Sequence, residues 1–160
     1  MVHNLSLVHV LLGLAAVACI YLAAREVRRS YVSQWPLFAP AAAALFVAAE
    51  LFLIQITAGS PAWTFGAAAV AGMAIGGIRG LSIGVKHDLY RPQMMISRPA
   101  KLVLLWVALG VGVCAGLEIV GAFSDNLEKV RYWAALSAIV CAMAMLARAL
   151  VLAIRLHRHI

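Results

Sequence analysis

The chain has 160 residues, of which 65% are hydrophobic and only 12% charged, and its mean hydropathy is +0.98. Soluble domains are about 45–50% apolar and about 25% charged, so a soluble fold is excluded. The formal net charge is +7, but the basic residues cluster between hydrophobic runs, which fits orientation in a membrane better than nucleic-acid binding. We therefore predict an all-α integral membrane bundle that forms one domain over residues 1–160 and has no nucleic-acid partner.

The first apolar run, about 5–24, is predicted to be a retained membrane helix. No basic leader of the secretory type precedes it, and Arg25, Arg28 and Arg29 follow it at once. This order of charge predicts an N-terminus outside the cytoplasm. Lipoprotein-type cleavage before Cys19 is an alternative, which the missing basic leader disfavours.

Four further apolar runs follow, each of about the 20 residues that a helix needs to cross the hydrocarbon core. Pro36 and Pro40 suit the first turn of the second run, and the sequence G-S-P at 59–61 suits a tight reversal after it. A polar stretch, 86–100, separates the third run from the fourth. The five predicted transmembrane helices span about 5–24, 36–58, 62–85, 101–123 and 132–154.

The distribution of lysine and arginine tests this layout, since cytoplasmic loops are enriched in both. With five spans and the N-terminus outside, only Lys129 and Arg131 lie on the outer side. The C-terminus is then cytoplasmic, and we predict the inner membrane of a bacterial cell. The other basic residues all fall on the cytoplasmic side: Arg25, Arg28, Arg29, Arg79, Lys86, Arg91, Arg98, Lys101, Arg148, Arg155 and Arg158.

Glycine recurs at every fourth position of the third run, in three overlapping G-x-x-x-G units that allow a neighbouring helix to approach closely. We predict that these glycines form the central packing seam of the bundle, with the fourth run and its own glycines as the partner. A self-association face, or a seam along which helices slide, is the functional alternative. The predicted seam comprises Gly72, Gly76, Gly80, Gly84, Gly112 and Gly116.

Ionisable residues inside apolar runs are costly in hydrocarbon and mark candidate functional positions. By helical rise, Glu50 lies near the membrane midplane, and His9 and Glu118 lie in the outer third. These three residues form a candidate intramembrane polar site that would share a proton or bind a cation. The alternative for Glu50 is a hydrogen bond to Gln55, Thr57 or the backbone. The alternative for the other two residues is snorkelling to the interface.

Several basic residues lie toward the cytoplasmic ends of the predicted helices. Arg79 and Arg148 are predicted to anchor their helices at the headgroups, with a buried pair as the alternative for Arg148. The polar stretch between the third and fourth runs is predicted to be a basic loop that rests on anionic lipid or docks a partner. The basic residues of this loop are Lys86, Arg91, Arg98 and Lys101.

No motif in the chain assigns a reaction or a cofactor. Cys19, Cys114 and Cys141 lie in apolar runs without C-x-x-C or Cys/His spacing, so we expect neither a disulfide nor a metal site. The sequence has no paired histidines for a haem, no H-E-x-x-H, no G-x-S-x-G and no phosphate-binding glycine loop. We therefore predict a protein that is not an enzyme. The sequence does not indicate whether it binds a cofactor.

The order of several parts is shared with a known family. The chain has a proline-led second helix at 36–40, the sequence D-L-Y-R at 88–91 before the fourth helix, and an arginine in the last helix. In these features it resembles the CcdC-like family of small bacterial membrane proteins, over most of its length. The resemblance implies a multi-pass bundle and, by the family's name, a link to cytochrome c biogenesis. It implies no catalytic residues, and neither the glycine series nor Glu50 matches a feature of the family.

These observations favour an accessory or assembly subunit of a membrane complex, which acts through helix packing and its basic loop. Its expected partners are membrane lipids and either another protein or further copies of the chain. The second hypothesis is a small oligomeric transporter or channel that uses Glu50 for protons or cations. The third is a membrane enzyme that acts on lipid or quinone.

Overall fold

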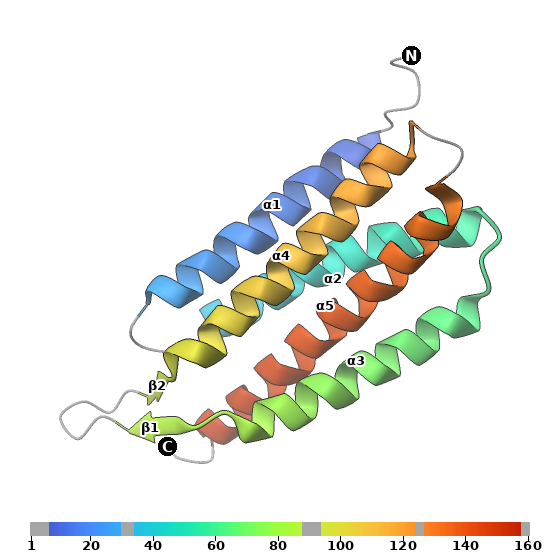
Figure 1. Ribbon diagram of the computed structural model, residues 1–160. Coiled ribbons are helices and arrows are strands. Elements are labelled where there is room, and N and C mark those ends of the chain that lie inside the picture. Colours follow the sequence, from blue (N-terminus) through green and yellow to red (C-terminus); the bar gives the residue numbers. More distant parts are fainter. Residues whose placement is uncertain (1–6, 30–33, 88–93, 124–126, 158–160) are drawn as a thin grey trace.

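The computed structural model describes residues 7–29, 34–87, 94–123 and 127–157. Five helices in these ranges pack side by side in one bundle (Figure 1), and each is long and apolar enough to cross a membrane. The predicted all-α, multi-pass membrane protein with five spans is confirmed. The helices are α1 (Leu7–Arg28), α2 (Gln34–Thr57), α3 (Ala62–Ser82), α4 (Arg98–Gly121) and α5 (Glu128–His157).

Consecutive helices run in opposite directions (Figure 1). The ends of α1, α3 and α5 and the beginnings of α2 and α4 therefore meet at one end of the bundle, which we call the basic end. The basic end corresponds to the side that the sequence predicts to be cytoplasmic, and its orientation in the membrane stays a prediction. The basic residues that the helices place toward this end are Arg25, Arg28, Arg29, Arg79, Arg98, Lys101, Arg148 and Arg155.

The connection between α3 and α4 contains an element that the sequence analysis did not predict. α3 ends at Ser82, before the predicted residue 85, and the chain enters strand β1 (Val85–His87), which pairs antiparallel with β2 (Met94–Ile96). This short hairpin replaces part of the predicted loop. α4 then begins three residues earlier than predicted, and α5 extends beyond the predicted 132–154 at both ends because charged and polar residues continue the helix.

The reversal between α2 and α3 is a Schellman turn. Gly59 has a φ of 85°, its N–H donates to Ile56 O, and the N–H of Ser60 donates to Gln55 O at 3.1 Å. The glycine is required here because side chains disfavour the left-handed backbone conformation. At the other end of α2 the helix begins earlier than predicted, at Gln34, so Pro40 lies inside the helix and not in its first turn.

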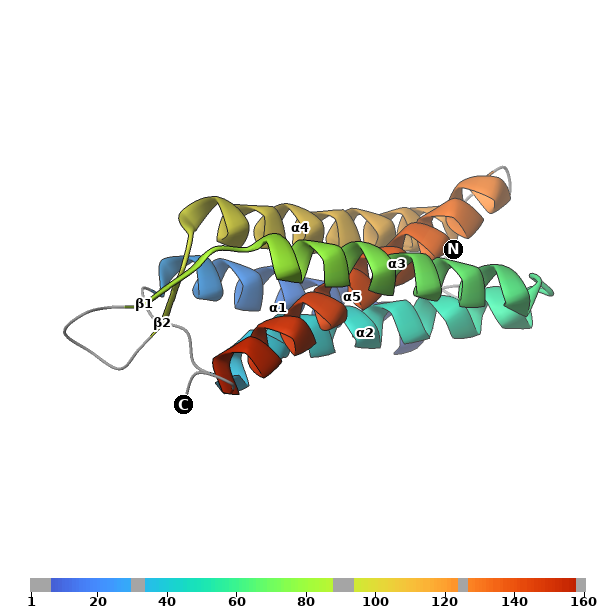
Figure 2. The same ribbon diagram turned by 90° about the horizontal axis from the view of Figure 1, so that it is seen from below.

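α5 occupies the centre of the bundle and packs against α3, α2 and α4, whereas α1 packs against α4 and α2 (Figures 1 and 2). The buried surface of α5 is built largely of alanines, which allow the neighbouring helices to approach closely. Toward the end opposite the basic end, Phe65 of α3 meets Phe52 and Tyr132 edge to face, with ring centroids 5.4 and 5.8 Å apart. The buried alanines of α5 are Ala134, Ala135, Ala138, Ala142 and Ala149.

Candidate functional site

The glycines of α3 face α5. A Cβ atom added to Gly72 would lie 2.5 Å from the carbonyl oxygen of Val140, and one added to Gly76 would collide with the backbone of Ala144. A Cβ at Gly80 would also meet α5, at 2.9 Å from a side-chain carbon. Real Cβ atoms do not approach so closely, so these three positions require glycine for α3 and α5 to lie at this separation.

The predicted partner of this glycine series was wrong. α3 packs chiefly against α5 and not against α4, because α5 occupies the centre of the bundle. Gly112 of α4 instead faces Ile20 of α1, at 2.7 Å from an added Cβ atom. Added Cβ atoms at Gly84 and Gly116 would have no other atom within 4 Å, so these two glycines are not part of a close seam.

Three charged side chains from three helices form a cluster at the basic end, which we call the charge cluster: Glu26, Lys101 and Arg148. They are 8%, 4% and 4% exposed. The Nη2 group of Arg148 donates to Oε1 of Glu26 at 3.3 Å, and Nζ of Lys101 donates to the carbonyl oxygen of Arg29 at 2.5 Å. The charge cluster therefore connects α1 with α4 and α5.

Sequence reasoning missed Glu26, because it lies beyond the predicted end of the first helix and among arginines. The signal that could have found it is helical spacing. The residues of α1 that are buried recur at intervals of four and three, and this series places Glu26 on the same face as Ala23. Lys101 and Glu118 likewise lie at the two ends of the buried face of α4. The buried residues of α1 are Leu12, Ala16, Cys19, Ala23 and Glu26.

The charge cluster corrects two predictions. Lys101 does not belong to the surface of the basic loop, because its side chain is buried between helices. Arg148 does not anchor the last helix at the headgroups, and the buried pair that was the alternative is what forms. Arg98 is exposed, whereas Arg91 and the side chain of Lys86 lie outside the described residues.

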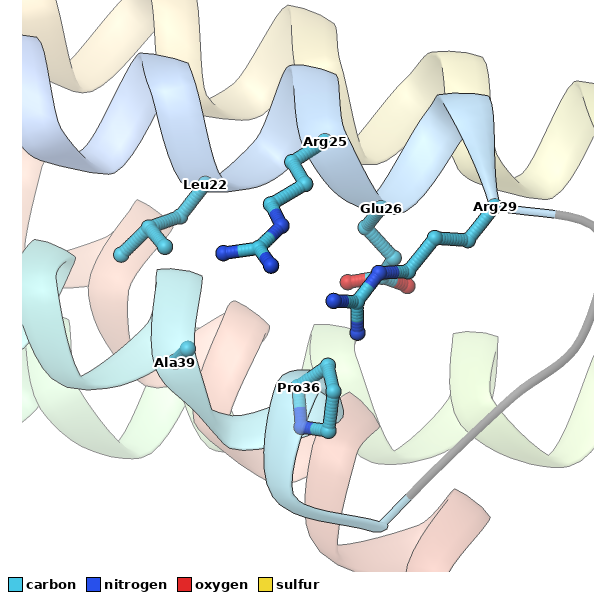
Figure 3. A pocket seen from close by; sticks show the side chains of 6 residues that line it. All are labelled: Leu22, Arg25, Glu26, Arg29, Pro36 and Ala39. Atoms are coloured by element: carbon cyan, nitrogen blue, oxygen red, sulfur yellow. The ribbon is translucent and has the colours of Figure 1, made fainter.

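A cavity of about 270 Å³ adjoins the charge cluster between α1 and the beginning of α2 (Figure 3). The side chains of Arg25, Glu26 and Arg29 extend into it from α1, and Pro36 and Ala39 line it from α2. Oε2 of Glu26 is buried and has no hydrogen-bond partner in the described part of the chain. The lining of the cavity thus combines one carboxyl group with two guanidinium groups.

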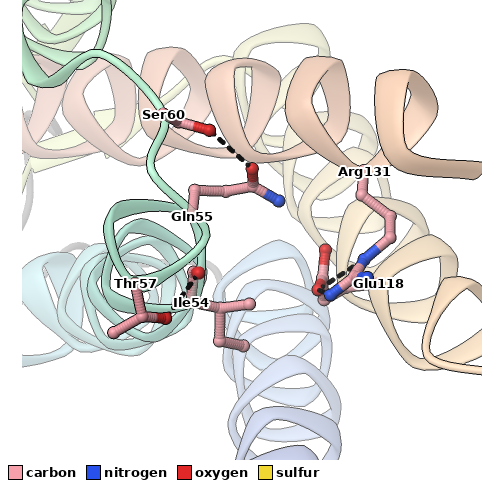
Figure 4. Close-up of polar contacts among 6 residues, drawn as sticks. All are labelled: Ile54, Gln55, Thr57, Ser60, Glu118 and Arg131. Carbon is pink, nitrogen blue, oxygen red and sulfur yellow. Dashed lines mark hydrogen bonds and ion pairs between the residues drawn. The ribbon is translucent and has the colours of Figure 1, made fainter.

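A second ion pair lies near the opposite end of the bundle (Figure 4). Glu118 is fully buried, and its Oε1 accepts hydrogen bonds from Nη2 of Arg131 and from Nε of Arg131, the latter at 2.9 Å. Gly121 makes room for this pair, since a Cβ atom there would lie 2.5 Å from Cδ of Arg131. The predicted snorkelling of Glu118 is therefore wrong, because an arginine of α5 reaches inward to meet it.

Glu50 lies inside the bundle but makes none of the predicted local hydrogen bonds. It is 9% exposed, and its Oε2 has no hydrogen-bond partner among the described residues. The hydroxyl of Thr57 donates to Ile54 O at 2.8 Å, and that of Ser60 donates to Oε1 of Gln55 at 3.1 Å (Figure 4). Glu50 is thus a buried carboxyl group whose Oε2 has no hydrogen-bond donor among the described residues.

The predicted group of His9, Glu50 and Glu118 is brought together only in part. α1 and α2 touch where Sγ of Cys19 donates to the carbonyl oxygen of Pro40 at 3.6 Å. From this contact, His9 lies ten residues along α1 and Glu50 ten residues along α2, both about 15 Å farther from the basic end. They therefore share one depth on adjacent helices. Glu118 is paired elsewhere, and the described residues contain no group of three side chains that could hold a metal ion.

Arg79 lines an open cavity of about 570 Å³ between α3 and the beginning of α4. Its side chain is exposed, as an anchor at the headgroups requires.

A second arginine, Arg155 of α5, caps the same end of α3. Nη1 of Arg155 donates to the carbonyl oxygens of Gly80, Leu81 and Ile83 at 2.8–3.2 Å, and so caps the helix.

Comparison of this chain with models of protein families, with curated proteins and with solved structures finds no match. Membership of the CcdC-like family stays a prediction from the order of the parts. The function has to be inferred from the residues of this chain.

Proposed function

We propose that this protein is an accessory subunit of a membrane complex, and that the outward face of α3 binds a transmembrane helix of its partner. This face lies opposite the glycines that pack on α5, at positions related by helical spacing: Ala67, Ala71 and Ala74. All three side chains are exposed. A row of alanines lets another helix approach closely, which is how helices associate in a membrane.

The composition of α3 is the observation that carries this proposal. α1 and α3 are equally little buried within the bundle, yet α3 has the lowest hydropathy of the five spans. The outward face of α1 consists of large aliphatic side chains such as Leu7, Leu14 and Val17, which suit lipid. The corresponding face of α3 carries the three alanines, with exposed large side chains such as Trp63, Val70 and Ile78 before, beside and after them. Such a face gains less from lipid contact and more from a helix.

The intramembrane charges support the same proposal. Glu26 and Arg148 bond to each other, and so do Glu118 and Arg131, so these four side chains join helices within the bundle. These pairs fix the position of α5, on which α3 packs through its glycines. We place the protein in the bacterial inner membrane, with the basic end in the cytoplasm, because basic residues are enriched on that side of membrane proteins.

The experiment is purification from the native membrane with variants of the outward face of α3. Ala71→Phe and Ala74→Phe place a large ring where the partner helix would lie. Ala18→Phe is the matched control, because Ala18 is exposed on α1. We expect a stoichiometric protein to copurify with the wild type and with Ala18→Phe, and to be lost from both α3 variants, while the melting temperatures stay alike.

Two outcomes would contradict this proposal. If a partner is retained equally by all variants, the outward face of α3 is not its binding site. If the chain purifies alone and as a monomer, the protein is not a subunit. A homo-oligomer that the α3 variants dissociate would identify the partner helix as α3 of a second copy.

Glu50 supports a second candidate function, a proton- or cation-linked transporter or channel. Its carboxyl group is buried at about the depth of His9, without a hydrogen-bond partner for Oε2 among the described residues. Ionisable groups within the membrane commonly lie on ion pathways. In proteoliposomes under a pH gradient, Glu50→Gln should abolish any flux that the wild type carries, whereas Glu128→Gln, an exposed position in the first turn of α5, should not. Absence of flux from the wild type would reject this function.

A further inference from the structure

The charge cluster and the cavity beside it carry more positive than negative charge. Glu26 is the carboxylate that the described residues place at the basic end, and it faces Lys101 and Arg148, which are both almost fully buried. Arg25 and Arg29 add two further cations at the wall of the cavity. Two buried cations, Lys101 and Arg148, thus accompany one buried carboxyl group, and the less buried Arg25 and Arg29 line the same cavity. Buried charge is destabilising unless it is compensated, so this excess favours an anion.

The cavity also offers specific hydrogen-bonding groups. The guanidinium groups of Arg25 and Arg29 line it and make no hydrogen bond or ion pair to the described residues. The carboxyl group of Glu26 belongs to the same lining, and its Oε2 is a buried acceptor without a donor among the described residues. A ligand that matches both features carries an anionic group for the arginines and an adjacent O–H donor for Glu26 (Figure 3).

We propose that this cavity binds a phosphate-bearing anion with a neighbouring hydroxyl. The arginines donate to the phosphate oxygens, since guanidinium groups match phosphate geometry with paired donors. The hydroxyl donates to Oε2 of Glu26. The remaining walls, Leu22, Pro36 and Ala39, are apolar. The source of the phosphate is either a phospholipid headgroup such as phosphatidylglycerol or a free phosphate compound in solution. This site goes beyond the proposed subunit function and does not depend on it.

The test uses the delipidated full chain in mild detergent, with lipid binding followed by native mass spectrometry. Arg25→Gln/Arg29→Gln should weaken phosphatidylglycerol binding about tenfold or more, because the phosphate loses its charge-assisted hydrogen bonds to both guanidinium groups. Arg28→Gln is the matched control, since Arg28 is exposed in the same turn and does not line the cavity. It should change binding by less than about twofold. Phosphatidylcholine should bind equally to all forms.

The fold of these variants can be checked independently. The hydrogen bond of Lys101 goes to the backbone carbonyl of Arg29, which the substitution keeps. Circular dichroism and the melting temperature should therefore match the wild type. If the double variant does not fold, Arg25→Gln alone serves, because Arg25 is exposed and contributes only to the cavity. Retention of phosphatidylglycerol by a folded Arg25→Gln/Arg29→Gln variant, at the wild-type affinity and with no response to phosphate, would overturn the proposal.

Titration with sodium phosphate at constant ionic strength separates the two sources. A rise in the melting temperature of the delipidated wild type, absent from Arg25→Gln/Arg29→Gln, would support a free phosphate. Selective binding of phosphatidylglycerol without a response to phosphate would support the lipid.

The role of Glu26 has its own comparison. Phosphatidylmethanol has the charge of phosphatidylglycerol but no headgroup hydroxyl, so it should bind about tenfold more weakly. Equal binding of the two lipids would overturn the hydrogen bond to Glu26.

Discussion

α5 is held on its two sides by different kinds of contact. Toward α3 the helices meet backbone to backbone at glycines, and the contact depends on shape alone. Toward α1 and α4 it is held by ion pairs, one from Arg148 near the basic end and one from Arg131 near the opposite end. The two arginines are 17 residues apart, about 25 Å along the helix. Contacts this far apart fix the register of α5, whereas the glycines fix its distance from α3.

This difference predicts that the two sides respond differently to substitution. The glycine contact cannot accommodate a larger side chain, because a Cβ atom at Gly72 or Gly76 would collide with backbone atoms of α5. An ion pair can be replaced by apolar groups if both partners change together.

Gly76→Leu should have the largest effect, because its Cβ atom would collide with the backbone of Ala144. We expect a loss of more than about 4 kcal/mol in the free energy of unfolding, or separation of α3 from the bundle. Gly77→Leu is the matched control, since an added Cβ there has no other atom within 4 Å. Unfolding in detergent, followed by tryptophan fluorescence, measures both. Equal stability of the two variants would show that α3 and α5 are not in close contact.

Removal of one partner of the Glu26–Arg148 pair should come next. Glu26→Leu leaves the buried guanidinium of Arg148 without its carboxylate, at a cost of about 3 kcal/mol. Glu26→Leu/Arg148→Met should recover most of this loss, because it removes both charges together. Unfolding of the wild type, Glu26→Leu, Arg148→Met and the double variant in one detergent gives the coupling energy. A double variant no more stable than Glu26→Leu would contradict the ion pair.

Gly121→Ala should have a smaller effect, because its Cβ atom meets the flexible side chain of Arg131 and not backbone. Arg131 would have to move, which weakens its bond to Glu118. We expect a loss of about 1 kcal/mol. Gly121→Ala combined with Arg131→Gln measures the coupling, and the alanine should then cost less than it does alone. A cost that does not change would place the effect of the alanine elsewhere.

Gly116→Ala should have the smallest effect. It lies inside α4, and an added Cβ has no other atom within 4 Å. Alanine is the better helix former by roughly 0.5–1 kcal/mol, so stability should stay the same or rise. A marked loss would mean that Gly116 packs closely against a neighbouring helix of the bundle, contrary to the open space around it. The same unfolding assay measures it.

The spans could be predicted from the sequence because hydropathy is a local property of about 20 residues. The distribution of basic residues also favoured five spans, and the structure places the described lysines and arginines, apart from Lys129 and Arg131, toward one end of the bundle. The glycine spacing predicted a face suited to close packing. It could not identify α5 as the partner, since a small-residue face is compatible with any neighbour.

The charge pairs were beyond prediction for a related reason. Glu26 and Arg148 are 122 residues apart, and each by itself resembles an interfacial residue at a helix end. The two side chains form an ion pair because both are buried between the same helices. Which residues are buried depends on which helices are neighbours. Lys101 changed from a loop residue to a buried one for the same reason.

The sequence by itself thus determined that this chain crosses the membrane five times and that one of its helices carries a face for close contact, because composition and helical spacing are properties of single segments. The tertiary structure alone decided that α5 lies at the centre, that its arginines meet Glu26 and Glu118, and that a cavity with an excess of cations lies beside α1. Each of these depends on the relative placement of separate helices, and no single segment encodes it.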